Sequence, residues 1–452
     1  MKKIILSAVC ALLFGALQVN AQWTSVGSTG FSEGEVYYTS SAFHPTSGEP
    51  YVAFNDGANS NKATVMKFDG TAWVNVGVAG FSAGTAAYTS LAFHPTSGEP
   101  YVAFQDGANS NKATVMKFDG TAWVNIGQAG FSPGQASYPS LAVNPTSGEA
   151  YVAFCDAANS YKATVMKFDG TAWVIVGTAG FSAGTAYYTS LEIQPTSGEP
   201  YLAFQDGANA GKITVMKFDG TSWVIVGAAG ILGGSTLTPS LAFHPTSSEP
   251  YLAFNDATHS NKATVMKFDG TSWVNVGPKG FSAGVATSPS LAFQPTSGEP
   301  FLAFIDVATS WKATVMKFNG TSWVHVGSPG FSAGQVNYLS LAFQPTSGEP
   351  YLAYRDIAND DKATVMKFVG NTTGINGASH SSITTVYPNP ANITLNIEVK
   401  EEASIKIANT LGATIATQIL NRGNNSIDVS GLTKGIYFLQ TDKGTAVKFV
   451  RE

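Results

Sequence analysis

The chain has 452 residues, of which 44% are hydrophobic and 12% charged, with 47 glycines and 21 prolines. It is too apolar for a disordered chain and too rich in turn residues for a helical one, so we expect a folded, all-β protein. The formal net charge is −5 and the 25 basic residues form no cluster, which argues against nucleic acid and anionic membrane surfaces as partners.

Residues 1–21 have the pattern of a cleaved signal peptide. Lys2 and Lys3 precede an apolar run from Ile4 to Leu17, and the segment 19–21 (Val-Asn-Ala) places small side chains before the expected cleavage site. The apolar run is too short for a permanent transmembrane segment, so we expect an exported mature chain that is soluble. Cys155 is then the one remaining cysteine, which excludes an intramolecular disulfide.

Residues 22–370 contain seven copies of a fifty-residue unit. Each unit has four short β-runs separated by turn residues, such as Tyr88–His94, Tyr101–Asp106, Lys112–Phe118 and Trp123–Gly127. Seven units of four strands predict a seven-bladed β-propeller, because radial repetition protects sheet edges that one open sheet would expose. The period is marked by KATVMKF, or KITVMKF once, beginning at Lys62, Lys112, Lys162, Lys212, Lys262, Lys312 and Lys362.

The ends of the repeat predict how the ring closes. The first unit begins with the Trp-containing strand at Trp23, whereas the last stops after Lys362–Phe368. We therefore expect the N-terminal strand to complete the last blade, with the Trp strands outermost. The loops Gly77–Ala87 and Asp106–Asn111 then share one face, called the upper face here, and the HPTSGEP and FDGT turns share the lower face.

Each unit ends its second strand with an aspartate at the upper face. These carboxylates could bind ligand hydroxyls or a cation, or each could simply open its loop as an Asx-turn. The loop after the first of them lacks the alternating oxygens and sixth-position glycine of a calcium loop, and we expect neither a metal nor a cofactor. The residues are Asp56, Asp106, Asp156, Asp206, Asp256, Asp306 and Asp356.

The turn Phe68–Trp73 is similar to the Asp-box of sialidases and related propellers. It departs from that pattern because Lys67 stands where the box has a hydroxyl residue and Gly70 follows Asp69 directly. Sialidase catalysis would also need an arginine cluster, whereas Arg355 is the only arginine between residues 22 and 370. The resemblance therefore implies a fold-stabilising turn, and no catalytic residue is assigned.

The units differ from one another mainly on the upper face. Tyr161 and Trp311 occupy a loop position that is Asn, Gly or Asp in the other units, and Arg355 precedes its aspartate where the others have Asn, Gln, Cys or Ile. Such variation suits a binding face with aromatic and polar groups, and drift of duplicated blades would explain it as well. Three acids are specific to single blades and form no recognisable catalytic set: Glu33, Glu35 and Glu192.

After a polar linker at 371–382, residues 383–452 predict a small β-sandwich with strands at 395–399, 405–408, 415–420, 427–429, 436–440 and 447–450. This part resembles the type A C-terminal sorting domain of the type IX secretion system of certain Gram-negative bacteria. The resemblance implies passage through the outer-membrane secretion machinery. It includes the motifs YPNPA, NTLG, KGIY and KFV, with Pro388, Asn389, Pro390, Gly412, Gly435, Tyr437 and Lys448.

Together these features predict an exported protein that reaches the outer cell surface or the medium by way of the periplasm. We expect its propeller to bind a ligand, with a glycan as the leading candidate, through Tyr161, Trp311, Arg355 and the seven aspartates. Two alternatives remain: a polysaccharide hydrolase or lyase built on the propeller, and a purely structural surface protein.

Overall fold

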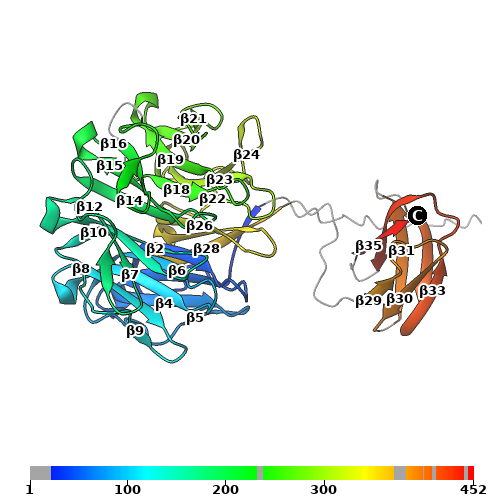
Figure 1. Ribbon diagram of the computed structural model, residues 1–452. Helices are drawn as coiled ribbons and strands as arrows, with labels where there is room; N and C mark the ends of the chain where they lie inside the picture. The colour runs from blue at the N-terminus through cyan, green and yellow to red at the C-terminus, as the bar shows by residue number, and fades with distance from the viewer. Residues whose placement is uncertain (1–21, 232–237, 371–382, 401, 410–413, 442–445) are drawn as a thin grey trace, which may run out of the picture. The chain divides into compact units, whose positions relative to one another are not determined.

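The computed structural model describes residues 22–231, 238–370, 383–400, 402–409, 414–441 and 446–452. The predicted signal peptide (1–21) and linker (371–382) lie outside the described residues. Contacts separate a unit over Gln22–Val369 from one that includes Gly370–Glu452. The first consists of seven four-stranded antiparallel sheets arranged around a common centre (Figure 1), which confirms the predicted seven-bladed propeller.

The four strands of a blade run outward from the centre in chain order. The inner strands are β2 (Val36–Phe43), β6 (Ala86–Phe93), β10 (Ala136–Val143), β14 (Ala186–Ile193), β18 (Ser240–Phe243), β22 (Ala286–Phe293) and β26 (Val336–Phe343). The second strands are β3 (Pro50–Asp56), β7 (Pro100–Asp106), β11 (Ala150–Asp156), β15 (Pro200–Asp206), β19 (Pro250–Asp256), β23 (Pro300–Asp306) and β27 (Pro350–Asp356).

The third strands are β4 (Lys62–Phe68), β8 (Lys112–Phe118), β12 (Lys162–Phe168), β16 (Lys212–Phe218), β20 (Lys262–Phe268), β24 (Lys312–Phe318) and β28 (Lys362–Val369). The outer strands are β5 (Trp73–Asn75), β9 (Trp123–Asn125), β13 (Trp173–Ile175), β17 (Trp223–Ile225), β21 (Trp273–Asn275), β25 (Trp323–His325) and β1 (Gln22–Ser25). Second and third strands are joined by 3-10 turns η1 (Gly57–Asn59), η2 (Gly107–Asn109), η3 (Ala157–Asn159), η4 (Gly207–Asn209), η5 (Ala257–His259), η6 (Val307–Thr309) and η7 (Ile357–Asn359).

The N-terminal strand β1 closes the ring as the sequence predicts. It pairs antiparallel with β28, with Trp23 opposite Phe368, so the last blade has the order β1-β28-β27-β26. The closing blade thus combines the two ends of the repeat, and the outer edge of β28 is covered in the same way as the third strand of every other blade.

Each blade is fastened to the preceding one by the indole of its outer tryptophan. In the second blade Trp123 Nε1 donates to the carbonyl oxygen of Val76 over 2.7 Å, and its ring stacks on Phe81 at a centroid distance of 4.1 Å. Gly77 adopts a φ of 73° beside these rings, and a Cβ there would lie 2.9 Å from Phe118. The tryptophan therefore joins neighbouring blades by one buried hydrogen bond and by aromatic packing.

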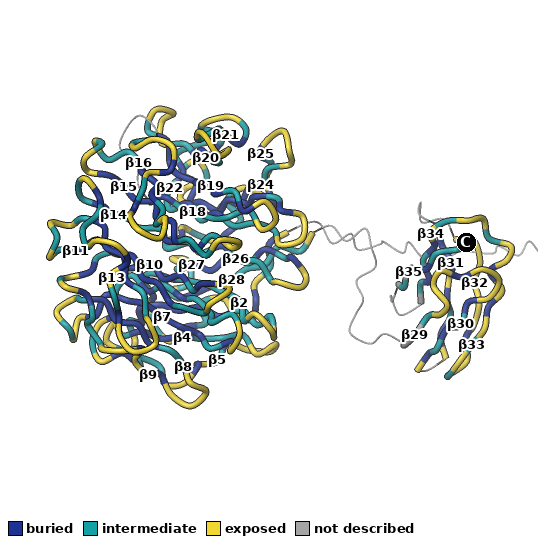
Figure 2. The backbone as a smooth tube through the Cα atoms, in the orientation of Figure 1, coloured by how far each residue is buried: buried dark blue, intermediate teal, exposed yellow. Residues whose placement is uncertain are grey.

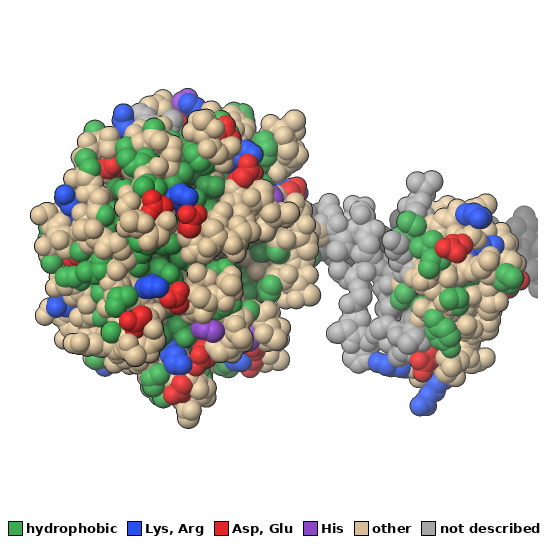
Figure 3. Space-filling model, viewed as in Figure 1, with side chains coloured by type: hydrophobic (Ala, Val, Ile, Leu, Met, Phe, Trp, Pro, Cys, Tyr) green, Lys and Arg blue, Asp and Glu red, His purple; other side chains and the backbone are tan. Residues whose placement is uncertain are grey.

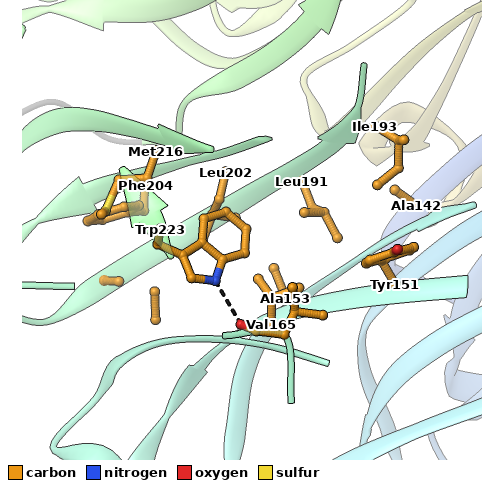
Figure 4. Packing of buried hydrophobic residues seen from close by; sticks show 13 residues of the cluster. Ala142, Tyr151, Ala153, Val165, Leu191, Ile193, Leu202, Phe204, Met216 and Trp223 are labelled. Carbon is orange, nitrogen blue, oxygen red and sulfur yellow. Dashed lines mark hydrogen bonds between the residues drawn. The ribbon is translucent and has the colours of Figure 1, made fainter. Parts of the chain in front are cut away.

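The space between blades is filled by large apolar side chains. Figure 4 shows one such cluster, in which Trp223 lies among Leu202, Val165 and Ala153. In the propeller the second strands are almost entirely buried, the third strands are buried in their middle, and most of the exposed residues lie in the loops (Figure 2). These strands are apolar on both faces because each blade is covered by a neighbour on either side.

The seven aspartates at the ends of the second strands hold the upper loops. In the second blade the carboxylate of Asp106 accepts from Ala108 N (3.0 Å), from Asn109 Nδ2 (2.9 Å) and from Thr114 Oγ1 (2.8 Å). Thr114 Oγ1 in turn accepts from Gly130 N over 2.8 Å, which fixes the next loop. The aspartates are at most 3% exposed in every blade, so each carboxylate serves as an internal acceptor for its own blade.

The C-terminal domain has two sheets. One has the order β29-β30-β33, from strands at Ile383–Tyr387, Thr394–Val399 and Gly423–Asp428, and the other has the order β32-β31-β34-β35, from Thr414–Leu420, Ala403–Asn409, Gly435–Thr441 and Ala446–Arg451. Leu395 and Ile397 of the first sheet share one core with Ile405, Leu439 and Phe449 of the second. The domain is a small β-sandwich, as the sequence predicts, with β29 as an additional strand.

Deleting residues 22–27 should abolish cooperative unfolding or cause aggregation. The deletion removes β1 together with Trp23 and Val26, whose carbonyl oxygen accepts from Trp73 Nε1. It leaves the edge of β28 unpaired and interrupts the tryptophan bonds on both sides of the closing blade. Thermal melting followed by circular dichroism, with the chain beginning at Gln22 as control, measures the effect. A melting curve equal to the control would contradict closure by β1.

Replacing Asp106 by Ala should destabilise the propeller by about 2–4 kcal/mol, because three donors lose their acceptor in a buried place. Asp119 is the matched control: it accepts backbone bonds in an exposed lower turn, so Asp119→Ala should cost clearly less. Urea denaturation of both variants checks this prediction. Equal loss of stability in the two variants would show that the buried aspartate has no special structural role.

Candidate functional site

The inner strands surround a cavity near the upper end of the propeller axis, with a volume of about 550 Å³. It is lined by residues 38–40 of the first unit and by their equivalents in the other units. The described lining residues are Tyr, Thr, Ser, Pro and Leu, so their side chains are uncharged and combine aromatic rings with hydroxyl groups. Tyrosine occupies the first of these positions in five blades: Tyr38, Tyr88, Tyr138, Tyr188 and Tyr338.

A bulge in the inner strand brings these tyrosines to the cavity. In the first blade the pairing of β2 with β3 shifts register between Tyr37 and Ser40, and Tyr38 adopts a φ of 54°. The equivalent residue of every blade has a φ between 50° and 55°, including Thr238 and Ser288. A bulky side chain in this left-handed region costs about 1–3 kcal/mol, and such strain is typical of functional positions.

The five tyrosines form a continuous arc around the cavity, called the tyrosine arc here. The ring centroids of Tyr338 and Tyr38 are 5.0 Å apart, and the next three neighbouring pairs are separated by 4.4, 4.7 and 4.6 Å. Burial and the neighbouring tyrosines raise the pKa of Tyr38 and of Tyr138 above the usual range. Their phenols are therefore neutral at physiological pH and can donate hydrogen bonds. Thr238 and Ser288 leave the arc open over two adjacent blades.

Tyr161 and Trp311, the aromatic residues predicted for the upper face, are 43% and 46% exposed. Both have a left-handed backbone, with φ of 59° and 63°, at a position that Asn, Gly or Asp occupies in the other blades. Those three residue types accept this conformation readily, whereas Tyr and Trp do so at a cost. Beneath Tyr161, burial raises the pKa of the Cys155 thiol to about 12, so this cysteine is an unreactive thiol.

The two exposed aromatic residues lie beside the two ends of the tyrosine arc. The carbonyl oxygen of Tyr161 accepts from Ala186 N over 2.8 Å, two residues before Tyr188. The carbonyl oxygen of Trp311 accepts from Val336 N over 3.1 Å, two residues before Tyr338. These bonds place Tyr161 and Trp311 on either side of the sector that contains Thr238 and Ser288. Among the residues that the structure describes, the upper end of the axis is thus asymmetric, with one exposed aromatic side chain beside each end of the arc.

The other predicted ligand-binding residues have structural partners. The seven aspartates are turned into their own loops, so the structure does not bring their carboxylates together. Arg355 pairs with Asp361 at 3.0 Å and with Glu35 at 3.5 Å, and its guanidinium lies 4.3 Å from the ring centre of Tyr37. This group joins the last blade to the first and leaves the charge of Arg355 compensated.

Charged side chains are scattered over the propeller face in Figure 3 rather than gathered in a patch. Within the described ranges, no group of three His, Cys, Asp or Glu side chains has the arrangement of a metal site. His44 of the lower turn accepts through Nδ1 from the backbone of Thr46 and Ser47. Among the residues that the structure describes, no helix has the length and apolar composition of a membrane span.

The tyrosine arc is not among the residues predicted from the sequence. The cavity is lined by the series that begins with Tyr38. The available signal was the repetition of tyrosine on an innermost strand, which in a propeller must lie near the axis. The bulge conceals this signal because it changes the alternation of side chains along the strand.

In the C-terminal domain, the motif residues lie around the last strand β35. Asn389 Oδ1 accepts from Val450 N over 2.9 Å, and Ala391 forms a parallel bridge with Arg451. The Tyr437 hydroxyl donates to the carbonyl oxygen of Thr433 over 2.8 Å, and its ring lies 5.7 Å from that of Phe449. Pro388 and Pro390 flank Asn389, both after cis peptide bonds, and Gly435 begins β34. Gly412 and the side chain of Lys448 fall outside what is described.

Comparison with solved structures finds PorZ, a bacterial surface component of the type IX secretion system of Porphyromonas gingivalis, at 13% identity and a TM-score of 0.47, covering 90% of this chain and 58% of PorZ. The chain thus spans less than two thirds of PorZ. An ulvan lyase of polysaccharide lyase family PL25 has 12% identity and a TM-score of 0.48, over 77% of this chain and 96% of that one. The Aleuria aurantia lectin has 15% identity and a TM-score of 0.46, over 68% of this chain and 100% of the lectin chain. No curated protein matches the sequence.

Residues 385–451 match the family described as the secretion system C-terminal sorting domain. The match covers the same segment as the motifs from Pro388 to Lys448 and confirms the predicted sorting domain. A protein with this domain is a cargo of the type IX system of Bacteroidetes-type bacteria. The chain is therefore a β-propeller protein that this system exports, either to the cell surface or to the medium.

Proposed function

We propose that the propeller binds a neutral glycan at the upper end of its axis. The observation that supports this proposal most directly is the axial cavity of about 550 Å³, with its tyrosine arc and surrounding hydroxyl groups. A glycan site needs aromatic faces for the apolar sides of sugar rings and hydrogen-bonding groups for their hydroxyls. The arc and the Thr and Ser residues of the inner strands combine both within one cavity.

The uncharged lining favours a neutral sugar over an acidic one. A carboxylated or sulfated glycan would need cations within the site, and the nearest arginine, Arg355, is already paired with two carboxylates. Tyr38 and Tyr138 have raised pKa values and therefore present neutral phenols, which suits hydroxyl partners.

Tyr161 and Trp311 extend this site outward. Their exposed rings flank the open sector of the arc, so a chain of sugars could pass between them while one unit enters the cavity. This arrangement accounts for two aromatic residues at strained backbone positions where other blades have Asn, Gly or Asp.

Binding is favoured over glycoside hydrolysis by the chemistry of the lining. Hydrolysis uses two carboxyl groups separated by roughly 5–10 Å across the scissile bond, and the described lining of the axial cavity has hydroxyl and aromatic groups instead. If the protein had a purely structural role, no function would account for the backbone strain at the tyrosines of the arc.

The Tyr161→Ala/Trp311→Ala double variant should bind its glycan about tenfold to a hundredfold more weakly than the wild type, because each stacked ring contributes about 1 kcal/mol. Its melting temperature should change little, since both side chains are exposed. The measurement is a glycan array followed by calorimetry with the best ligand. Trp123→Ala is the stability control and should cost about 3–5 kcal/mol of unfolding free energy.

Tyr88→Ser provides a test within the cavity, because serine occupies the equivalent position in the sixth blade as Ser288. This variant should fold and also weaken glycan binding. No ligand on the array, or unchanged affinity in both variants, would refute the proposed site, and release of reducing ends from a polysaccharide would favour the enzyme instead.

A chain that ends at Ser382 should fold as a propeller but fail to reach the cell surface or the medium of its native host. It lacks the whole segment that matches the sorting domain. Cell fractionation with an antibody to the propeller would detect the truncated chain in the periplasm. Normal delivery of the truncated chain would show that residues 383–452 are not needed for export.

A further inference from the structure

One inner-strand position differs in a single blade. Six blades have alanine there, and the fourth blade has Glu192. The alanines are Ala42, Ala92, Ala142, Ala242, Ala292 and Ala342. Replacement of alanine by a longer, ionisable side chain at the centre of a repeated scaffold has to be accommodated by the neighbouring blades.

Glu192 lines a second cavity of about 340 Å³, formed by inner strands β6, β10 and β14. Its other lining residues include Leu91, Phe93 and Val143 and the backbone around them. Pro145 also lines it and belongs to the turn after β10, so this cavity lies toward the lower face, away from the tyrosine arc. Glu192 is the only titratable residue of the described lining.

The carboxyl group of Glu192 has no partner among the residues that the structure describes. Its side chain is only partly exposed, and no hydrogen bond or ion pair joins it to any of the described residues. Burial alone raises the pKa of this carboxyl to about 7. Titratable groups on neighbouring elements do not contribute to this shift: Tyr201 on β15, the Glu199–Lys217 pair, and His94 and His244 at the ends of β6 and β18.

An unpaired acid at this place lowers the stability of the free protein. Because its pKa is raised on folding, the folded state loses stability as the pH rises from about 4.5 through 7. Alanine, which the other six blades have, would avoid this cost. A buried acid that destabilises the free protein and has no partner within it is explained by a ligand that pairs with its carboxylate.

We propose that this lower axial cavity binds a primary ammonium group on an aliphatic chain, with the Glu192 carboxylate as its counter-ion. Leu91, Phe93 and Ile193 contribute the apolar part of the lining, which can contact the methylene groups next to the ammonium, and backbone groups contribute the polar part. The inner strands are terminal strands of their sheets, so the backbone groups left unpaired at their edges include carbonyls that can accept the remaining ammonium protons.

A primary ammonium fits this cavity better than a metal ion. Calcium requires six to eight oxygen ligands and magnesium a near-ideal octahedron, usually with more than one carboxylate. A single carboxylate in a cavity lined by backbone groups and aliphatic side chains matches instead a single positive charge that can donate several hydrogen bonds. This site is separate from the proposed glycan site and does not depend on it.

The experiment uses the full mature chain and n-butylammonium chloride, with the neutral isostere n-butanol as reference. At pH 8 the wild type should bind n-butylammonium about tenfold or more tightly than the Glu192→Gln and Glu192→Ala variants do. The affinity of the wild type should fall as the pH is lowered from 8 to 5.5, because protonation of Glu192 removes the counter-ion. Both variants should bind weakly at every pH.

Glu149→Gln is the matched control. It removes one negative charge from the lower face, where Glu149 pairs with Lys167, and should leave amine binding and its pH dependence intact. Isothermal titration and melting curves of all four proteins give the affinities and show that each is folded. Equal binding of butanol and butylammonium by the wild type, equal affinity in Glu192→Ala, or no binding at pH 8 would each overturn the proposal.

Discussion

The hydrogen bond from each outer tryptophan to the preceding blade is the interaction on which the propeller depends. The seven indoles donate to carbonyl oxygens of Val26, Val76, Ile126, Val176, Val226, Val276 and Val326 over 2.7–2.8 Å. Since Trp23 of β1 and Val26 directly after it each take part in one bond, the N-terminal segment contributes to two of these bonds. The ring is complete only when the two ends of the repeat meet, so pairing of β1 with β28 is needed for every blade to have two neighbours.

This repeated framework allows the side chains at the axis to differ from blade to blade. Trp123, Asp106 and Thr114 and their equivalents keep the blades and upper loops in place through bonds inside the blade or to one neighbour. The side chains at the axis do not take part in these bonds. Thr238 or Ser288 can therefore replace tyrosine, and Glu192 can replace alanine, in blades that keep four strands, although β18 after Thr238 is shorter than the other inner strands. The repeated blades thus allow different side chains to line the cavities at the axis.

Much of the fold could be predicted because its determinants repeat locally in sequence. The run Lys112–Phe118 is found as strand β8 with the same bounds, and the early start of the repeat at Trp23 correctly predicts closure. The cavities could not be predicted in the same way. Tyr38 reaches the axis because of a bulge that simple alternation does not reveal, and the walls around Glu192 come from two other blades. Strand β29 was missed because its pairing with β30 is a tertiary contact beside a polar linker.

The two cavities share one physical property, which is that both contain groups that reduce stability. The tyrosine arc places bulky side chains at positive φ, and Glu192 is an acid that has no partner among the described residues. Each is a local departure from what the framework alone would favour, since Asn or Gly suits the first conformation and alanine the second position. The positive φ recurs in all seven blades, with tyrosine in five of them, whereas the glutamate occurs in one blade alone. Both groups lie at the axis, where the inner strands of several blades line the same cavity, and this is the arrangement that a binding role requires.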